Sequence, residues 1–304
     1  MINILISGVG GFVGKNWISF SSLDSKYNNI PLKRGEKMDV DQLIGDYKNV
    51  FLHLAGKAHD LKNTTSSDDY YQINTELTKK KFDAFLDSDA KLFITVSSVK
   101  AVSDEVDVAL TEEVIPNPLT HYGKSKLLAE QYILSQVIPA GKRVYILRPC
   151  MIHGPGNKGN LNLLYKLVSK GLPWPLGDFK NSRSYCSVEN LCFIIKELID
   201  RNDIPSGIYN VSDDEPISTN QVVSLIAESK GKSARILNLS KSFIRAIARL
   251  GDFLKLPLNT ERLKKLTESY VVSNAKIKAA LGKPLPVSSK EGLIRTFQSF
   301  AENA

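Results

Sequence analysis

A glycine-rich segment near the start of the chain restricts its fold more than any other feature. The stretch GVGGFVG (residues 8–14) directly follows an apolar run over residues 2–6 and opens an amphipathic stretch. Glycines at such positions permit a tight strand-to-helix turn and let the backbone approach a pyrophosphate at the positive end of a helix. We therefore expect a dinucleotide-binding βαβ unit in which the cofactor contacts Gly8, Gly11, Phe12, Val13 and Gly14.

Short apolar runs alternate with helical stretches through the first half of the chain. The pattern predicts strands near residues 2–6, 30–33, 50–54, 92–96 and 144–147, and helices near 12–22, 68–86 and 120–137. This order is typical of an α/β fold, a Rossmann-like doubly wound parallel sheet with helices on both faces.

The second half has a different character. Glycine and proline cluster after Pro149, and a capping box over Ser218–Gln221 predicts a helix that ends at Gly231. We expect an NAD(P)-binding domain of residues 1–155 plus about 183–212. A smaller C-terminal substrate lobe would hold about 156–182 and 213–304.

Composition excludes several classes of protein. Apolar residues make up 42% and charged residues 24% of the chain, as in soluble globular proteins. No apolar run approaches the roughly 18 residues that a membrane-spanning helix needs. The three cysteines form no CxxC pair, which argues against a disulfide framework or a zinc site and favours a cytoplasmic location. No metal site is expected.

The positive charge is confined to one half of the chain. Residues 1–150 contain 18 basic and 18 acidic side chains, so the net charge of +8 lies in residues 151–304. This excess is either a simple basic surface or a field that attracts an anionic ligand. Nucleic acid is not the expected partner, because basic blocks and basic–aromatic interleaving are missing.

The strongest chemical signal is the segment YGKSK. Tyr122 and Lys126 are four residues apart in a predicted helix, so their side chains share a face. A tyrosine becomes a base at neutral pH only if its pKa falls from about 10 to about 7, which requires roughly 4 kcal/mol. A nearby ammonium and a nicotinium charge can supply that energy. Ser98, after the strand that ends at Val96, can hydrogen-bond the same substrate oxygen. We predict a catalytic set of Ser98, Tyr122 and Lys126.

The end of the second predicted strand is basic. NAD sites usually carry a carboxylate there, whereas Lys33 and Arg34 would pair with the 2′-phosphate of NADP. Asp39 and Val40 follow where a segment next to the adenine is expected. These residues favour NADP over NAD, although both cations could also be solvated surface charges.

Together these features resemble the extended short-chain dehydrogenase/reductase family of the NAD-dependent epimerase/dehydratase type. The resemblance covers essentially the whole chain, through GVGGFVG (8–14), HLAG (53–56), Asn74, VSS (96–98), YGKSK (122–126), LRPCMIHGPG (147–156) and RSYCSVENL (183–191). It implies a cofactor bordered by Leu54, Ala55, Gly56, Asn74, Ser97, Tyr122, Lys126, Pro149 and Met151. It implies substrate contacts from Ser98, Asn160, Leu176, Arg183 and Arg262, and Lys57 is a further candidate.

Departures from the family pattern narrow the expected activity. Sugar 4,6-dehydratases carry Asp-Glu after the strand-end serine or threonine, whereas Val99 and Lys100 follow Ser98 here. A dehydratase is therefore disfavoured. Val102 and Ser103 replace the usual Tyr-Gly pair, which would alter contacts with the sugar.

The resemblance implies oxidation and reduction at C4 of a nucleotide-linked sugar. Because Lys33 and Arg34 favour NADP, we expect a UDP-(N-acetyl)hexose 4-keto reductase, and a NAD-dependent UDP-sugar 4-epimerase is the alternative. A cofactor-sensing regulator of the same fold would generally lack the tyrosine. The helices near 68–86 and 120–137 are candidates for a homodimer interface.

Residues 242–256 are both apolar and basic. We expect a helix packed on the core of the substrate lobe. The alternative is a helix at a membrane surface, in an enzyme that uses a lipid-linked sugar.

Overall fold

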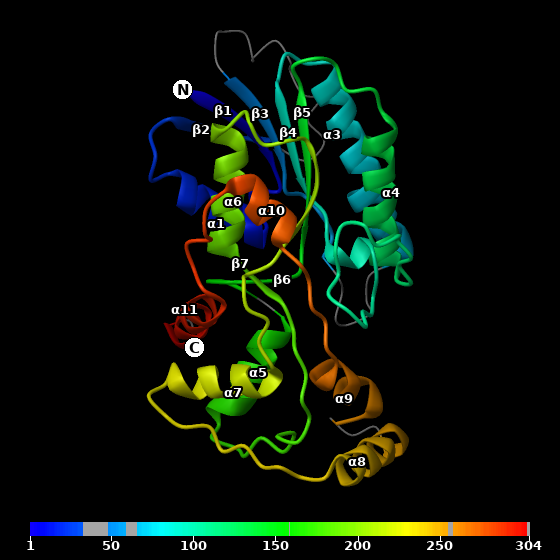
Figure 1. Cartoon of the computed structure of the whole chain (residues 1–304), viewed down its shortest axis with the longest axis vertical. Helices are drawn as coiled ribbons and strands as arrows, with labels where there is room; N and C mark the ends of the chain where they lie inside the picture. Colours follow the sequence, from blue (N-terminus) through cyan, green and yellow to red (C-terminus); the bar gives the residue numbers. More distant parts are fainter. Residues whose placement is uncertain (33–47, 59–65, 158, 255–257, 303–304) are drawn as a thin grey trace.

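A parallel sheet forms the centre of the larger part of the molecule. The computed structural model describes residues 1–32, 48–58, 66–157, 159–254 and 258–302 (Figure 1). Within these ranges, a six-stranded sheet has the order β2-β1-β3-β4-β5-β8. Its strands are β1 (Ile2–Ser7), β2 (Tyr27–Leu32), β3 (Lys48–His53), β4 (Leu92–Val96), β5 (Arg143–Pro149) and β8 (Gly207–Val211). The predicted doubly wound α/β fold is confirmed.

Helices cover both faces of this sheet (Figure 1). On one face lie α1 (Phe12–Ser21), α6 (Val188–Asp200) and α10 (Ala275–Leu281), and on the other lie α3 (Leu77–Leu86) and α4 (His121–Ser135). Side chains alternate accordingly along β1, since Ile4 and Ile6 join one apolar cluster and Leu5 joins the other. Burial on both faces explains why the central strands are almost continuously apolar.

Two elements differ from the sequence prediction. β2 begins at Tyr27, earlier than expected, because Asn28, Asn29 and Pro31 resemble a loop but are tolerated in an edge strand. The predicted helix 68–86 is not one regular α-helix: α2 (Ser67–Tyr70) and α3 flank a π-helical turn over Tyr71–Glu76. Four predicted cofactor residues lie outside the described residues, namely Lys33, Arg34, Asp39 and Val40.

The smaller part of the molecule contains two further apolar clusters. One joins α5 (Asn160–Ser169), α7 (Thr219–Glu228) and α11 (Ser289–Glu302), and the other joins α8 (Lys241–Leu254) and α9 (Thr260–Thr267) to residues 174–179. The Ser218–Gln221 capping box is present, although α7 ends at Glu228 rather than at Gly231. α10 packs beside the sheet, although we assigned its residues to the substrate lobe. The domain boundaries stay a prediction.

A short parallel pair connects the two parts. β6 (Met151–His153) follows β5, and its partner β7 (Tyr185–Ser187) precedes α6. His153 is buried between Thr296 and Asp213, with its ring nitrogens 2.9 and 3.3 Å from their side-chain oxygens. This histidine of β6 therefore connects α11 to the segment that contains Asp213, which is a structural role.

The strand order creates a site for ligands at one edge of the sheet. β1 has β2 on one side and β3 on the other, so the winding direction reverses between β1 and β3. In open α/β sheets, ligands bind outside the carboxyl ends of the strands at such a point. The glycine loop after β1, residues 54–57 after β3 and Ser97 after β4 all lie at this edge.

The glycine loop is closed by contacts that only glycine permits. Gly8 has φ +86°, and a Cβ there would lie 2.5 Å from the backbone nitrogen of Ala55. A Cβ on Gly14 would lie 2.2 Å from the carbonyl oxygen of Gly8, whereas one on Gly10 would meet nothing within 4 Å. The loop is thus pressed against both α1 and the segment after β3.

Two alanine substitutions test this packing. Gly14→Ala should lower the free energy of unfolding by about 1–3 kcal/mol, because the added methyl group must displace backbone. Gly10→Ala is the matched control and should change it by no more than about 0.5 kcal/mol. Urea unfolding measures both, and equal effects would show that the loop is not closely packed at Gly14.

Candidate active site

Three predicted catalytic side chains meet at the carboxyl end of β4. Tyr122 and Lys126 lie one turn apart at the start of α4, and the Thr120 side chain caps this helix by accepting a hydrogen bond from the nitrogen of Gly123. Ser98 begins the short 3-10 turn after β4, and a side-chain hydrogen bond joins it to Tyr122. The helix approaches that turn closely, since a Cβ on Gly123 would lie 2.3 Å from the carbonyl oxygen of Lys100.

The protein alone does not turn Tyr122 into a base. Burial raises the pKa of its phenol, Tyr70 raises it further, and the hydrogen bond from Ser98 lowers it. The Tyr70 ring meets the Tyr122 ring edge-on, with the centroids 6.0 Å apart. We expected Lys126 and a nicotinium charge together to lower this pKa, and in the protein alone the lowering effect comes from Ser98. A productive phenolate therefore needs additional positive charge brought by a bound group.

Lys126 holds a buried ammonium at the edge of the sheet. Its Nζ donates a hydrogen bond to the carbonyl oxygen of Val96 at 3.0 Å. Burial lowers the pKa of Lys126 to about 8, and the Glu130 carboxylate opposes that decrease. A Cβ on Gly56 would lie 2.9 Å from Nζ, so a side chain there would push the ammonium out of this position. Lys126 stays charged at neutral pH and loses its proton as the pH rises through about 8.

Asn74 fixes the segment after β3 against α4. Its Oδ1 accepts from the nitrogen of Lys57 at 2.8 Å, and its Nδ2 donates to the carbonyl oxygen of Lys57 and to Oγ of Ser125. The side chain is fully buried and lies in the π-helical turn, a kind of irregularity that occurs frequently at functional sites. Asn74 thereby positions Gly56 and Lys57 beside the Lys126 ammonium.

Sequence reasoning missed the role of His53. Its ring is buried between Oγ of Ser7 at 2.6 Å and Oγ1 of Thr78 at 2.9 Å. Burial lowers the pKa of His53 to about 3, and repulsion from Lys126 adds to the decrease. The neutral ring connects β1, β3 and α3 beneath the site. Only its place in HLAG drew attention to it.

An ion pair behind the lysine was also missed. Glu130 lies one turn after Lys126 and accepts from Nε of Arg148, with both oxygens 3.1 Å away. Both side chains are at most 3% exposed, and Ser97 donates its hydroxyl hydrogen to the same carboxylate. The spacing Tyr122, Lys126, Glu130 places all three on one helix face, a signal that could have identified Glu130.

The carboxyl ends of the sheet strands have the geometry expected of a dinucleotide site. The N-terminus of α1 opens beside the glycine loop, where backbone N–H groups and the helix dipole favour a phosphate. Leu54 and Ala55 close the loop from β3, and Pro149 and Met151 flank the end of β5. These residues follow the carboxyl ends of β1, β3 and β5, and Lys126 contacts Val96 at the end of β4.

The predicted substrate residues are more widely spaced than the predicted catalytic residues. Lys57 lies 3.8 Å from a carboxylate oxygen of Asp69, and Asn160 is exposed at the first position of α5. Arg183 donates to the carbonyl oxygen of Lys265 at 2.6 Å, which ties it to α9, the helix that carries the exposed Arg262. Leu176 is buried in the cluster around α8, so its side chain belongs to the core.

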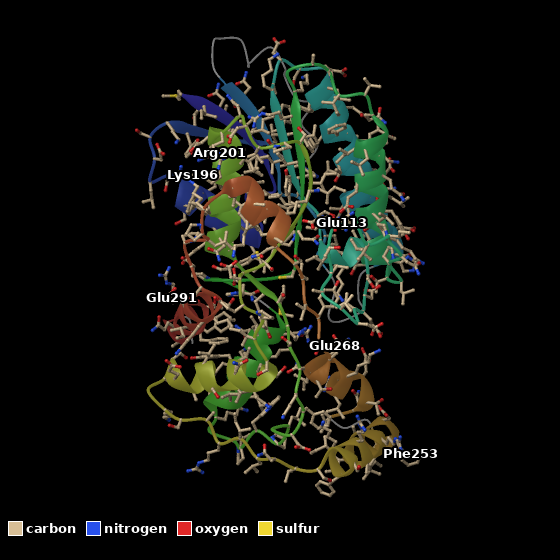
Figure 2. All side chains as sticks on the ribbon, in the orientation of Figure 1. Glu113, Lys196, Arg201, Phe253, Glu268 and Glu291 are labelled. Carbon is tan, nitrogen blue, oxygen red and sulfur yellow. The ribbon has the colours of Figure 1, made fainter. Side chains whose placement is uncertain are left out.

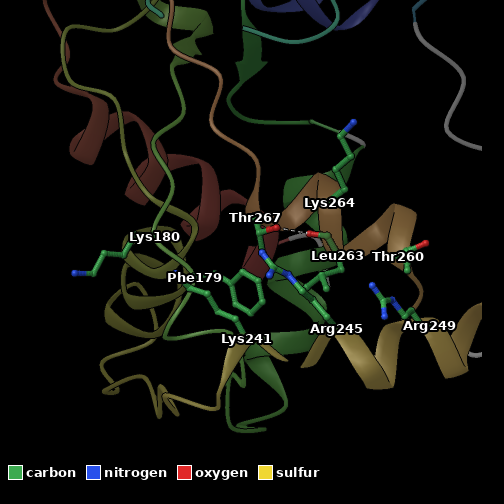
Figure 3. Close-up of a pocket in the computed structure, with 9 residues that line it drawn as sticks. All are labelled: Phe179, Lys180, Lys241, Arg245, Arg249, Thr260, Leu263, Lys264 and Thr267. Atoms are coloured by element: carbon green, nitrogen blue, oxygen red, sulfur yellow. Dashed lines mark hydrogen bonds between the residues drawn. The ribbon is translucent and has the colours of Figure 1, made fainter. Parts of the chain in front are cut away.

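A basic cavity of about 450 Å³ lies between α8, α9 and residues 179–180 (Figure 3). Its lining includes five cationic side chains and no acidic one: Lys180, Lys241, Arg245, Arg249 and Lys264. This part of the structure accounts for much of the positive charge in the C-terminal half. The part of the chain that the structure describes contains no acidic or histidine cluster suited to a metal ion.

The residue at the dehydratase acid–base position is engaged elsewhere. Lys100 donates to the carbonyl oxygen of Asp104 at 2.7 Å, and its Nζ lies 4.2 Å from the ring centroid of Tyr270. Cys150 is buried, and burial raises the pKa of its thiol, so it is not an active nucleophile.

Comparison with known proteins identifies the family. Residues 4–212, more than half of the chain, match the model of the NAD dependent epimerase/dehydratase family. The chain belongs to this family. The predicted resemblance is thereby confirmed, and the relatives include nucleotide-sugar epimerases and reductases, so the protein is an enzyme.

Relatives align with nearly the whole chain. UDP-glucose 4-epimerase of Vibrio cholerae is 30% identical over 99% of this chain and 96% of its own length. An Escherichia coli O157:H7 enzyme, N-acetyl-α-D-glucosaminyl-diphospho-ditrans,octacis-undecaprenol 4-epimerase, is 25% identical over 97% of this chain and 94% of its own length. GDP-6-deoxy-D-mannose reductase of Pseudomonas aeruginosa is 25% identical over 74% of this chain and 79% of its own length.

A solved structure shares the complete fold. The UDP-glucuronic acid 4-epimerase of Bacillus cereus, in complex with NAD, superimposes with a TM-score of 0.76 at 18% identity, and covers 99% of both chains. Among the described residues, no helix has the length and apolar character needed to cross a membrane.

The buried Glu130–Arg148 pair gives a prediction with two readouts. Glu130→Gln leaves an uncompensated buried guanidinium, so it should lower the free energy of unfolding by about 3–5 kcal/mol. It should also shift the alkaline fall of kcat, expected near pH 8, to lower pH, because the carboxylate raises the pKa of Lys126.

A double variant separates these two effects. Glu130→Leu with Arg148→Met removes both charges and should recover most of the lost stability, which urea unfolding measures. A pH profile of the Glu130→Gln variant identical to that of the parent would show that Glu130 has a purely structural role.

Proposed function

We propose that this protein is a 4-epimerase that inverts C4 of a hexose carried on a nucleoside diphosphate. The observation that carries the proposal is the Ser98–Tyr122 hydrogen bond together with the Lys126 ammonium, at the carboxyl ends of β3 and β4. Two relatives that align with at least 97% of this chain are 4-epimerases, which favours inversion over net reduction.

The chain's own residues would handle the proton. Tyr122 takes the proton of the C4 hydroxyl as C4 loses hydride, and Ser98 donates a hydrogen bond to the same oxygen. Lys126 stabilises the negative phenol oxygen through its charge. A nicotinamide, when bound, supplies the hydride acceptor and donor. The resulting 4-keto sugar turns within the site, and Tyr122 returns the proton when C4 regains hydride on its other face.

The charge of the substrate lobe supports an anionic carrier on the sugar. Arg183, at the edge of α9, and Arg262 on that helix are the proposed diphosphate contacts, and Asn160 would add an amide from α5. A planar guanidinium offers two parallel donors to phosphate oxygens. A diphosphate linked to a nucleoside and one linked to a lipid present the same group to these side chains.

A 4-keto reductase is the second candidate, and one observation favours it. β2 ends at Leu32, and the next two residues in the sequence, Lys33 and Arg34, are of the type that favours a 2′-phosphate. A reductase consumes reduced cofactor at each turnover, whereas an epimerase regenerates its cofactor. NADP and NAD therefore remain the two candidate cofactors, with NADP tied to the reductase.

An experiment without added reduced cofactor separates the two activities. Purified protein with UDP-glucose or UDP-N-acetylglucosamine should form the galacto epimer at catalytic turnover with NAD⁺ alone. A 4-keto nucleotide sugar with NADPH should give no sustained loss of nicotinamide absorbance. The opposite pattern would establish the reductase in place of the epimerase.

Variants at the phenol test the proposed role of Tyr122. Tyr122→Phe should reduce kcat by about 10²–10⁴-fold while dinucleotide binding is retained, because only proton transfer is removed. The matched control is Tyr71→Phe, which removes a hydroxyl from a tyrosine that instead contacts His121 on the exposed side of α4. Full activity of Tyr122→Phe would refute the mechanism.

A further inference from the structure

Helix α8 is only partly covered by the rest of the protein. Ile244, Ala248 and Gly251 face the core of the smaller lobe, where they pack against the cluster that contains Trp174 and Leu263. These positions are spaced at i, i+4 and i+7, so they account for one face of the 14-residue helix. We expected this helix to pack on the core of the smaller lobe, and only the face with Ile244, Ala248 and Gly251 does so.

A second face of α8 exposes large apolar side chains. Phe243 is 55%, Leu250 54%, Phe253 85% and Leu254 53% exposed. Phe243, Leu250 and Leu254 are seven and four residues apart, so they form one stripe along the helix. Phe253, three residues after Leu250, lies next to this stripe. Figure 2 shows Phe253 projecting from the end of the molecule farthest from the sheet. Four large exposed apolar groups on one helix are more than isolated surface residues.

A row of cations runs along another face of the helix, largely opposite the stripe. Lys241, Arg245 and Arg249 recur every fourth residue and line the basic cavity (Figure 3). Among the described residues, none of the three has an acidic partner within salt-bridge distance. Asp252 is the one acidic residue in positions 241–254, and its carboxylate accepts a hydrogen bond from the nitrogen of Thr260.

We propose that α8 docks the protein on an anionic membrane surface. The apolar stripe would enter the region between headgroups and acyl chains, while the long cationic side chains on the polar face of the helix reach lipid phosphates. A bilayer is the occupant that fits both features, because it offers an apolar layer and a plane of negative charge. The helix lies at the outer end of the smaller lobe (Figure 1), where a flat surface can reach it without touching the sheet. This inference does not rest on the proposed epimerase activity.

Vesicle co-sedimentation of the full chain tests the proposal. Vesicles of equal parts phosphatidylcholine and phosphatidylglycerol should bind the protein, and high salt should weaken that binding. Vesicles of phosphatidylcholine alone should bind it much more weakly. Arg245→Gln with Arg249→Gln should reduce partitioning to the anionic vesicles by about 30-fold, as expected for two lost cations near a charged surface.

The apolar stripe is tested by a separate pair of substitutions. Leu250→Ser with Phe253→Ser should reduce partitioning by at least about 10-fold, because the apolar area available for burial is lost. Both side chains are exposed, so the melting temperature should stay unchanged. The matched control is Leu23→Ser with Leu134→Ser, which are 86% and 58% exposed on the larger part of the molecule and should leave vesicle binding intact.

Three results would overturn the proposal. One is the absence of binding to anionic vesicles at low salt, and another is an equal loss of binding in the control pair. The third is a dimer in light scattering that the Leu250→Ser and Phe253→Ser pair converts to monomer without any vesicle binding by the parent, because a second copy of the chain would then cover this face.

Discussion

The burial of one positive charge organises the active edge of this protein. The Lys126 ammonium is held in a largely desolvated position by the carbonyl oxygen of Val96 and by the charge of Glu130. Gly56 leaves space beside this ammonium, and burial together with repulsion from Lys126 keeps His53 neutral between two hydroxyl groups. Removing water from an ammonium is costly, so each of these neighbours either supplies compensation or leaves space. The groups packed behind Lys126 therefore determine the geometry of the site as much as the groups that face a ligand.

The sequence predicts the parts of this arrangement that depend on local spacing. The glycine turn follows from glycines directly after an apolar run, and the central strands follow from short continuous apolar runs. The shared face of Tyr122 and Lys126 follows from the helical period of 3.6 residues. None of these needs tertiary information. The start of β2 was misplaced because polar residues and proline in an edge strand resemble a loop. The π-helical turn that carries Asn74 has no periodic signal, and the partners of Asn74, Ser125 and Lys57, come from other segments of the chain.

Charged and neutral partners from distant segments were harder to anticipate. Arg148 is a charged residue in an otherwise apolar strand, and the sequence does not show its partner. The fold places Glu130 of α4 against Arg148. His53 likewise has partners 46 and 25 residues away, in β1 and α3. Helix α8 shows the same limit in another form. Its periodicity predicts a helix with an apolar face and a basic face, but only the fold shows that some apolar residues are buried and others exposed.

The uneven charge of the two halves agrees with the proposed reaction, in which one half binds the anionic carrier and the other half reacts with C4 of the sugar. A sugar that must present both faces of C4 to the same tyrosine has to rotate near Tyr122 while its anionic end stays held elsewhere. Arg183 and Arg262, the side chains proposed to hold the diphosphate, belong to residues 151–304, whereas Tyr122 belongs to residues 1–150. The cations along α8 are assigned to a membrane surface and take no part in this binding. Tight binding of the carrier and loose binding of the sugar are compatible only if they occur in different parts of the molecule.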